Sequence, residues 1–461
     1  MQYTLTMLES HYADLVRLLM TDRTREHAAY LMGRVSRSDS DVRLLVREVR
    51  PLRSEEVLSS SPIHMKIAAS SFMRELKRAD QTKQVFLFVH SHPNGPDRHS
   101  EQDDLEERKL FSTAYIRIDN PGPHGSLVMS SDGSIKGRVW MESGECLPID
   151  TIRIIGNQFR FYRNIETAPD ERFFQRQVLA FGGLLQSVLK DIHVGVVGVG
   201  GTGSSVVEQL IRLGAGRITV FDGDRLDESN VSRVYGSGTA DKGRNKTSIA
   251  KRLAEQIGLG TRLVAVPDFI TFESVARTLR ECDVVFGCTD DEWGRSILTR
   301  LTVYYYIPVF DMGVRFDSNQ GELRSVQGRV TTMLPGGACL FCRGRLNAEN
   351  IAAEVVEATD PEAAANLRAE GYIPELASRA PAVVSFTTAV AASAVTELLH
   401  RLTGFLGGER TSSEVLHLFD QTRVRTNNVA PDPACFCTDR AFLGRGDSNP
   451  LLDITWREEQ S

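Results

Sequence analysis

The glycine-rich stretch HVGVVGVGGTGSSVVEQL, residues 193–210, constrains the fold more than any other part of the chain. An apolar run of strand type leads into a turn, and a run of helix type follows it directly. Glycines at such a turn let the backbone approach a phosphate, and the amides at the start of the helix donate to it. We therefore expect this turn to bind a nucleotide through Gly198, Gly200, Gly201 and Gly203.

Strand-type and helix-type segments alternate through the second half of the chain, in RITVFD, NKTSIAKRLAEQI and CDVVFGCT. This alternation predicts a parallel, doubly wound α/β sheet over residues 190–440. Residues 1–150 instead predict a compact α+β domain with a hairpin turn at Asp132-Gly133. The polar stretch 151–189 is expected to be a linker with the first helices of the next domain, and 441–461 a C-terminal tail.

Composition excludes several classes of function. The net charge of −6 gives no reason to expect a nucleic-acid partner. No apolar run approaches the roughly 20 residues that cross a bilayer, and the first residues lack the pattern of a signal peptide. We expect a soluble cytoplasmic protein without a membrane partner.

Charged residues after the glycine turn favour a triphosphate over a dinucleotide. Asp222 follows the second strand, where a dinucleotide-binding enzyme also has an acid, so this residue alone leaves both readings open. Further cations and amides follow within one turn-and-helix region, and several such groups suit a triphosphate better than a single pyrophosphate. Asp290 comes just past a later strand, where a carboxylate can hold Mg²⁺.

A second constellation follows the apolar run VFLFV in the first domain. His90 and His92 leave a predicted strand two positions apart, so they point to the same side. Asp103, at the expected start of a helix, can add an oxygen ligand. Two nitrogens, one carboxylate and an open position predict a catalytic zinc site. In the alternative reading the histidines are polar surface residues and Ser100 only caps a helix.

This constellation, H-S-H-P-x6-S-x2-D, resembles the signature of the JAMM (JAB/MPN) metalloproteases, which cleave ubiquitin-like proteins from their C-terminal attachments. The resemblance covers residues 1–150. It implies that His90, His92 and Asp103 bind zinc, that Glu26 in EHAAYLMG activates the water, and that Ser100 stabilises the oxyanion. Ala28 and Ala29 depart from the family pattern around the glutamate. His99 lies outside the pattern and is interpreted as a polar bystander.

Residues 170–440 resemble the ThiF/MoeB family, the adenylating core of ubiquitin-activating enzymes, through the motifs D-x-D, N-x-x-R, K and C-T-D-D-x-x-x-R. The resemblance implies that ATP and Mg²⁺ are cofactors. Asp222 would bind ribose and Asp290 Mg²⁺. Asn230, Arg233 and Lys246 would contact the phosphates, and Asp224 and Asp291 would also bind the nucleotide. Arg233, Lys246 and Asp290 would be catalytic as well. Arg295 fills the final arginine position of the second motif.

Asp291 and Arg176 differ from the other motif positions in what the resemblance implies for them. Asp291 stands where the family usually has Asn, which could alter ribose or metal contacts. Arg176, in ERFFQRQVLAFGG, matches the arginine that reaches the nucleotide of the other subunit in a family dimer. The resemblance therefore implies a homodimer through the adenylating domain. In the alternative interpretation Arg176 is a surface residue of a helix.

Paired cysteines predict a metal site, since such pairs in a cytosolic chain indicate ligands before disulfides. By resemblance they form the family's structural zinc site, and reduced, unliganded thiols are the alternative. The C-x-C spacing of the second pair predicts strained geometry or another fourth ligand. The pairs are Cys339 with Cys342 and Cys435 with Cys437.

The chain lacks a cysteine where ubiquitin-activating enzymes carry one, since none occurs between Cys342 and Cys435. Cys282 and Cys288 flank a predicted core strand, and Cys146 matches nothing. We therefore hypothesise adenylation without a thioester on the chain itself. A hydroxyl of Ser385 or Thr387 is an alternative acceptor.

Together these resemblances predict a bifunctional enzyme of a bacterial ubiquitin-like conjugation system, such as those of antiphage defence. The metalloprotease would expose or release the C-terminal glycine of a ubiquitin-like β-grasp protein, and the second domain would adenylate it for a conjugating-enzyme-like carrier. The main alternative is activation of a β-grasp sulfur carrier for cofactor or cysteine synthesis. A scaffold with decayed sites and an NAD-linked oxidoreductase are weaker alternatives.

Overall fold

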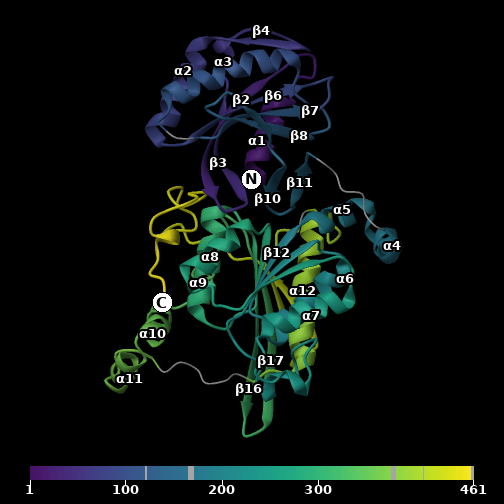
Figure 1. Cartoon of the computed structure of the whole chain (residues 1–461), viewed down its shortest axis with the longest axis vertical. Coiled ribbons are helices and arrows are strands. Elements are labelled where there is room, and N and C mark those ends of the chain that lie inside the picture. Colours follow the sequence, from purple (N-terminus) through teal and green to yellow (C-terminus); the bar gives the residue numbers. More distant parts are fainter. Residues whose placement is uncertain (120–121, 165–170, 375–380, 409, 458–461) are drawn as a thin grey trace. The chain divides into compact units, whose positions relative to one another are not determined.

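The computed structural model describes residues 1–119, 122–164, 171–374, 381–408 and 410–457. The chain forms two compact units (Figure 1). The first comprises Met1–Glu166 and Gly444–Asp447, and the second comprises Thr167–Leu443 and Ser448–Ser461.

The first unit is built on a nine-stranded mixed sheet, in the order β11-β10-β1-β3-β2-β6-β7-β8-β9. Strand β1 is parallel to β3 and β10, and β6 is parallel to β7. The strands are β1 (Gln2–Leu8), β2 (Ala28–Arg37), β3 (Asp41–Pro51), β6 (Val85–His92), β7 (His124–Ser130), β8 (Ile135–Trp140), β9 (Cys146–Pro148), β10 (Thr151–Ile155) and β11 (Arg160–Arg163), with β4 (Val57–Ser61) and β5 (His64–Ile67) as a separate pair.

Alternation along the strands buries both faces of this sheet. In β2, Ala29 and Leu31 join one core cluster with residues of α1 (Glu9–Leu19). Tyr30 and Met32 join the other, with residues of α2 (Ala69–Thr82) and α3 (Glu101–Arg117). The expected hairpin turn at Asp132-Gly133 joins β7 to β8, with Gly133 at φ +85°.

The structure divides the chain differently from the sequence expectation. Strands β10 and β11 lie in the segment expected to be a linker, because Ile152 and Ile154 alternate into the core of the first unit. The expected tail also packs, since Leu451 and Leu452 are each 1% exposed.

The second unit carries an eight-stranded sheet in the order β14-β13-β12-β15-β16-β17-β18-β19. It is parallel from β14 to β16, as expected, and antiparallel from β16 to β19. The antiparallel pairing of β16 with β17 follows from the tight turn at Gln320-Gly321, both at positive φ. The strands are β12 (His193–Val197), β13 (Arg217–Phe221), β14 (Arg262–Val266), β15 (Val284–Gly287), β16 (Val309–Asn319), β17 (Glu322–Met333), β18 (Glu414–Leu418) and β19 (Arg423–Asn427).

Helices cover both faces of this sheet, with α6, α7 and α12 on one side and α8 and α9 on the other (Figure 1). Strand order reverses between β12 and β15, and ligands of open α/β sheets bind at the carboxyl ends of strands at such a reversal. The helices are α4 (Glu171–Phe181), α5 (Gly183–Asp191), α6 (Gly201–Leu213), α7 (Lys246–Ile257), α8 (Glu273–Thr278), α9 (Glu292–Tyr305), α10 (Ala348–Thr359), α11 (Pro361–Ala369) and α12 (Val384–Thr403). None of the helices among the described residues combines the length and apolarity needed to span a membrane.

Candidate functional site

In the first unit two histidines and an aspartate converge beyond the end of β6. His90 and His92 are two positions apart in β6, and Asp103 lies in the first turn of α3. The Nε2 atom of His90 is 3.2 Å from His92 Nε2 and 3.4 Å from Asp103 Oδ1. The predicted convergence of these three side chains is confirmed.

The donor set of this cluster fits a zinc ion. Its ligand atoms all lie within 4.8 Å of one another, and two imidazoles with one carboxylate leave a coordination position open. His92 Nδ1 is 3.1 Å from the carbonyl of Pro96, so a proton donated there leaves the Nε2 lone pair facing the cluster. Burial raises the pKa of Asp103, but hydrogen bonds and the charge of His90 outweigh burial and hold that pKa below its usual value.

Glu26 lies beside this cluster in the approach to β2. Ala28 pairs with His90 across β2 and β6, and Glu26 lies two positions before Ala28. The Glu26 residue is only 8% exposed, and burial raises the pKa of its carboxyl, with the nearby His90 charge acting in the opposite direction. Its backbone is fixed because Glu26 N donates to Ser61 O at 2.9 Å. A buried carboxylate here is suited to accept a proton.

Ser100 holds the aspartate of the cluster in place. Its backbone N–H and its hydroxyl donate to Asp103 Oδ2 at 2.6 and 2.7 Å, and Asp103 N donates back to Ser100 Oγ at 3.2 Å. Ser100 is therefore the N-cap of α3 in a capping box. Its role toward an oxyanion stays a prediction.

His99 is not the polar bystander that the sequence predicts, because it belongs to a buried polar network near the cluster. Glu107 Oε2 accepts from Ser126 Oγ at 2.6 Å, Arg138 Nε at 2.9 Å and Trp140 Nε1 at 3.0 Å. Because the Ser126 hydroxyl gives its proton to Glu107, His99 Nε2 donates to Ser126 Oγ at 2.9 Å. Burial lowers the pKa of His99, which fits a neutral donor. The sequence feature that could have indicated this network is Glu107, which lies four residues after Asp103 and therefore on the same face of α3.

In the second unit each glycine of the turn after β12 is required, or tolerated, for a different physical reason. Gly198 adopts φ +86°, which side chains rarely adopt. A Cβ at Gly203 would lie 1.8 Å from the carbonyl oxygen of Gly198, so only glycine allows this close packing. At Gly200 a Cβ would meet nothing within 4 Å, because the residue faces an open cavity. Gly201 lines the same cavity at the first position of α6.

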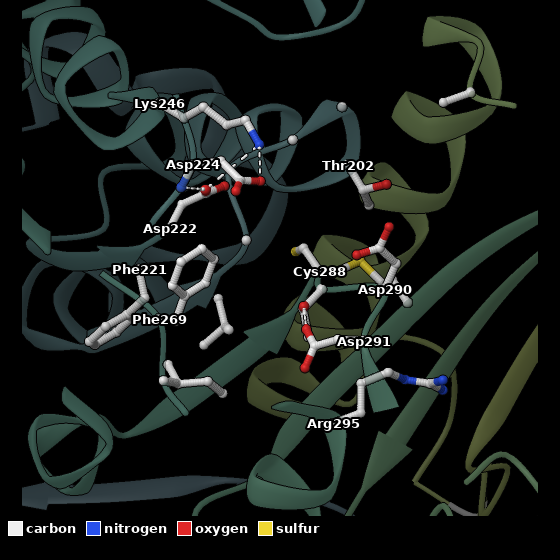
Figure 2. A pocket seen from close by; sticks show the side chains of 18 of the residues that line it. Thr202, Phe221, Asp222, Asp224, Lys246, Phe269, Cys288, Asp290, Asp291 and Arg295 are labelled. Atoms are coloured by element: carbon white, nitrogen blue, oxygen red, sulfur yellow. Dashed lines mark hydrogen bonds and ion pairs between the residues drawn. The ribbon is translucent and has the colours of Figure 1, made fainter. Parts of the chain in front are cut away.

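Acids and a lysine face one another next to this turn. Asp222, after β13, accepts from Val199 N at 2.7 Å, which fixes the turn to the neighbouring strand. Lys246 Nζ is 2.8 Å from Asp224 Oδ2 and 3.7 Å from Asp222 Oδ1. Burial raises the pKa of Asp222, and the Lys246 charge opposes that rise. Figure 2 shows these side chains on one wall of the cavity.

The cavity has a volume of about 880 Å³ and collects most of the predicted nucleotide residues. It lies at the carboxyl ends of the parallel strands, where strand order reverses. Figure 2 shows Asp290 across the cavity from Lys246. Gly203 and Arg176 do not line it. The predicted residues that do are Gly198, Gly200, Gly201, Asp222, Asp224, Asn230, Arg233, Lys246, Asp290, Asp291 and Arg295.

Asp291 is the N-cap of α9. Its carboxylate accepts from the backbone N–H of Gly294 and from the Thr289 hydroxyl. Asn and Asp cap helices about equally well, so the departure from the family pattern leaves this capping role intact. Asp290 is exposed and lines the cavity, and it is not the residue that caps α9.

Arg295 is held by a carboxylate that the sequence reading missed. Its Nε and Nη2 atoms donate to Asp311 Oδ1 and Oδ2 at 2.9 and 3.0 Å, and Arg329 Nη1 donates to Asp311 Oδ2 at 2.6 Å. Burial raises the pKa of Asp311, but the two guanidinium charges outweigh it and hold that pKa below its usual value. An aspartate inside the apolar run IPVFDMG was the available signal.

The four paired cysteines meet, as predicted. Their sulfur atoms lie 3.5–3.7 Å apart for the pairs Cys339–Cys342, Cys339–Cys435 and Cys342–Cys437. Sulfurs about 2.3 Å from one zinc ion would be about 3.8 Å apart in a tetrahedron. Cys435 and Cys437 both reach the cluster, so the C-x-C pair supplies the third and fourth sulfurs and no other fourth ligand is needed. The four sulfurs fit a structural zinc ion.

The other thiols and the two candidate hydroxyls differ in their access to the cavity. Cys288 lines the cavity, but burial strongly raises the pKa of its thiol. Cys282 is fully buried, and Cys146 is exposed in the first unit. Thr387 lines the cavity with its hydroxyl 3.1 Å from Val384 O, whereas Ser385 is exposed on α12 and does not line it.

Arg176 is exposed on α4, outside the cavity of its own chain. Its expected reach to a partner subunit's nucleotide, and the homodimer itself, stay predictions.

These features define an α/β unit with a cavity at the switch point of its sheet, and a mixed α+β unit with a His-His-Asp cluster. The model of the ThiF family matches residues 174–438, and the model of prokaryotic homologs of the JAB domain matches residues 8–135. The chain belongs to the ThiF family and carries an N-terminal JAB domain.

Among similar proteins, the adenylyltransferase and sulfurtransferase UBA4 of Meyerozyma guilliermondii is 27% identical over 155 residues, 33% of this chain and 37% of that protein. The sulfur carrier protein adenylyltransferase of Thermus thermophilus is 31% identical over 149 residues, 32% of this chain and 55% of that protein. The chain thus spans roughly a third to a half of these relatives. A structure of E. coli MccB with MccA-N7isoASN aligns at 16% identity and TM-score 0.47, covering 58% of this chain and 75% of that one.

Proposed function

We propose that the second unit adenylates the C-terminal glycine of a small β-grasp protein of the ubiquitin-like type. The observation that carries this proposal is the cavity of about 880 Å³, in which the glycine turn, Lys246 and Asp290 face the same space. Phosphates would lie against Gly200 and the first amides of α6, which point donors at them.

The reaction would join the glycine carboxylate to the α-phosphorus of ATP and release pyrophosphate. Lys246 and Arg233 would bind the phosphate oxygens and stabilise the charge that develops on them. For that, Lys246 would turn from Asp224, which it contacts at 2.8 Å. Asp290, exposed in the cavity, would hold Mg²⁺.

The chain would pass the adenylate on without forming a thioester of its own. Cys288 is in the cavity, but its raised pKa keeps it a thiol at neutral pH, and the thiolate is the nucleophile. The acceptor would be a nucleophile of a partner, such as a conjugating-enzyme-like carrier. A covalent acyl adduct mapped to any cysteine of this chain would contradict this.

The first unit would act as a zinc peptidase on the same partner protein, cutting after the glycine in a precursor or a conjugate. His90, His92 and Asp103 would hold the ion, and Glu26 would take and return the proton. A zinc ion there would lower the pKa of a bound water and polarise the scissile carbonyl.

A second candidate is activation of a β-grasp sulfur carrier. The Thermus thermophilus relative, named a sulfur carrier protein adenylyltransferase, favours it. The two candidates share the adenylate and differ in the next acceptor. A product that depends on sulfide or thiosulfate would identify sulfur transfer, and a lysine-linked conjugate would identify the first candidate.

ATP–pyrophosphate exchange with a glycine-tailed β-grasp partner tests adenylation. Lys246→Ala should abolish exchange, whereas Lys251→Ala, an exposed lysine on the same helix, should leave it unchanged. No exchange with any glycine-tailed candidate would overturn the proposal.

Zinc analysis and cleavage of a β-grasp fusion test the peptidase. The intact protein should hold two zinc ions per chain, His92→Ala one, and the control His417→Ala, on β18, two. Glu26→Gln should keep both ions and lose cleavage, which separates proton transfer from metal binding. Cleavage that survives in Glu26→Gln would exclude the assigned base.

A further inference from the structure

The segment Ser448–Arg457 lies beyond the region 174–438 matched by the ThiF model, yet it reaches the nucleotide cavity. Leu451 and Leu452 are buried within the second unit. Tyr304 Oη donates to Asp453 Oδ2 at 2.7 Å, and Arg300 Nη1 donates to Leu452 O at 3.1 Å. The segment is therefore fixed to α9 and is a built part of this unit.

Arg457 ends this segment at the cavity wall. Its backbone N–H donates to Thr271 O at 3.1 Å, and the residue forms a parallel bridge with Phe272. The guanidinium carbon lies 4.9 Å from the centre of the Phe272 ring and 5.7 Å from that of Phe269. Arg457 and Phe269 both line the cavity.

The positions of these residues along the sheet edge indicate which part of a nucleotide they meet. The glycine turn follows β12, Asp222 follows the adjacent β13, and the Asp268–Thr271 loop follows β14, next in the sheet. A Cβ at Gly223 would lie 2.4 Å from the Phe269 ring, so this ring covers the backbone just after Asp222. Figure 2 shows Phe269 on the side of Asp222 away from Lys246.

We propose that Arg457 and Phe269 form the base-binding end of the cavity, with the planar guanidinium and the ring stacking on the adenine. This inference rests on the proposed nucleotide binding and adds a determinant from outside the family region. Three observations support it. The guanidinium is planar and stacks on aromatic faces, it has no ion-pair partner among the described residues, and the Phe269 ring, 39% exposed, lines the cavity.

Calorimetric titration of the full-length protein with Mg-ATP, AMP and adenosine tests the assignment. Arg457→Ala should weaken all three by a similar factor, about three- to tenfold, because the base is common to them. Arg457→Lys should recover part of the loss, since it restores the charge without the plane. Thr455→Ala, an exposed neighbour in the same segment, should bind like the wild type.

A double variant tests whether Arg457 and Phe269 act on the same part of the nucleotide. Phe269→Leu should weaken binding by a similar factor, and Arg457→Ala in that background should add less than it does alone. Unchanged affinity in Arg457→Ala, or a loss confined to ATP, would overturn the inference while leaving the proposed function intact. A wild-type protein that binds no ATP would instead overturn the proposed function.

Discussion

Two alanine substitutions in one turn separate packing from phosphate binding. Gly203→Ala places a methyl group 1.8 Å from the carbonyl oxygen of Gly198, and no side-chain rotation relieves a clash with backbone. Overpacking costs about 1–3 kcal/mol where side chains can shift. Here the turn or α6 must move, so we expect about 3 kcal/mol, or a fall in Tm of about 6–12 °C.

Gly200→Ala should give the opposite outcome. Its φ of −78° suits alanine, and the added methyl meets nothing within 4 Å. We expect a stability change within about 0.5 kcal/mol. The methyl points into the space where phosphate would approach the backbone. Because glycine allows that close approach and alanine would block it, ATP affinity should fall at least about tenfold.

Thermal unfolding and calorimetric ATP titration of both variants provide the assay. The expected pattern is a destabilised Gly203→Ala and a stable Gly200→Ala that has lost ATP affinity. If Gly203→Ala unfolds at the wild-type temperature, the close helix–strand packing is wrong. If Gly200→Ala binds ATP normally, the phosphates do not lie against this turn.

Three further substitutions test carboxylates that accept hydrogen bonds inside the two units. Asp311→Asn should cost about 3–5 kcal/mol in urea unfolding, because Arg295 and Arg329 lose their shared carboxylate. Since the folded-state pKa of Asp311 is depressed, its contribution should be complete above about pH 4 and be lost as pH falls through the folded value, a loss absent in the variant. Glu107→Gln should destabilise the first unit by about 1.5–3 kcal/mol, measured by Tm, because its charged acceptor becomes neutral. Glu354→Ala should cost about 1 kcal/mol in urea unfolding, because this carboxylate accepts from the first amides of α9.

The sequence predicted what depends on local pattern. Apolar runs located β12, β13 and β15, and the glycine spacing located the turn between β12 and α6. The histidine pair was predictable for the same reason, since strand geometry alone places His90 and His92 on one side.

What the sequence did not predict depends on long-range register. The contact of Arg329 with Asp311 requires the pairing of β16 with β17, which no local pattern specifies. His99 and Ser126 meet only because α3 packs near β7, and Arg457 reaches the cavity only after its segment packs on α9. Each depends on tertiary contacts between residues far apart in the chain.

The four-cysteine cluster joins positions 96 residues apart in the chain, Cys339 and Cys435. Closing a loop of that length by a covalent cross-link removes about 4–5 kcal/mol of chain entropy from the unfolded state. A metal ion in that cluster would restrain the polypeptide that continues toward Arg457. Loss of zinc would then lower the affinity for ATP although no residue of the cavity had changed.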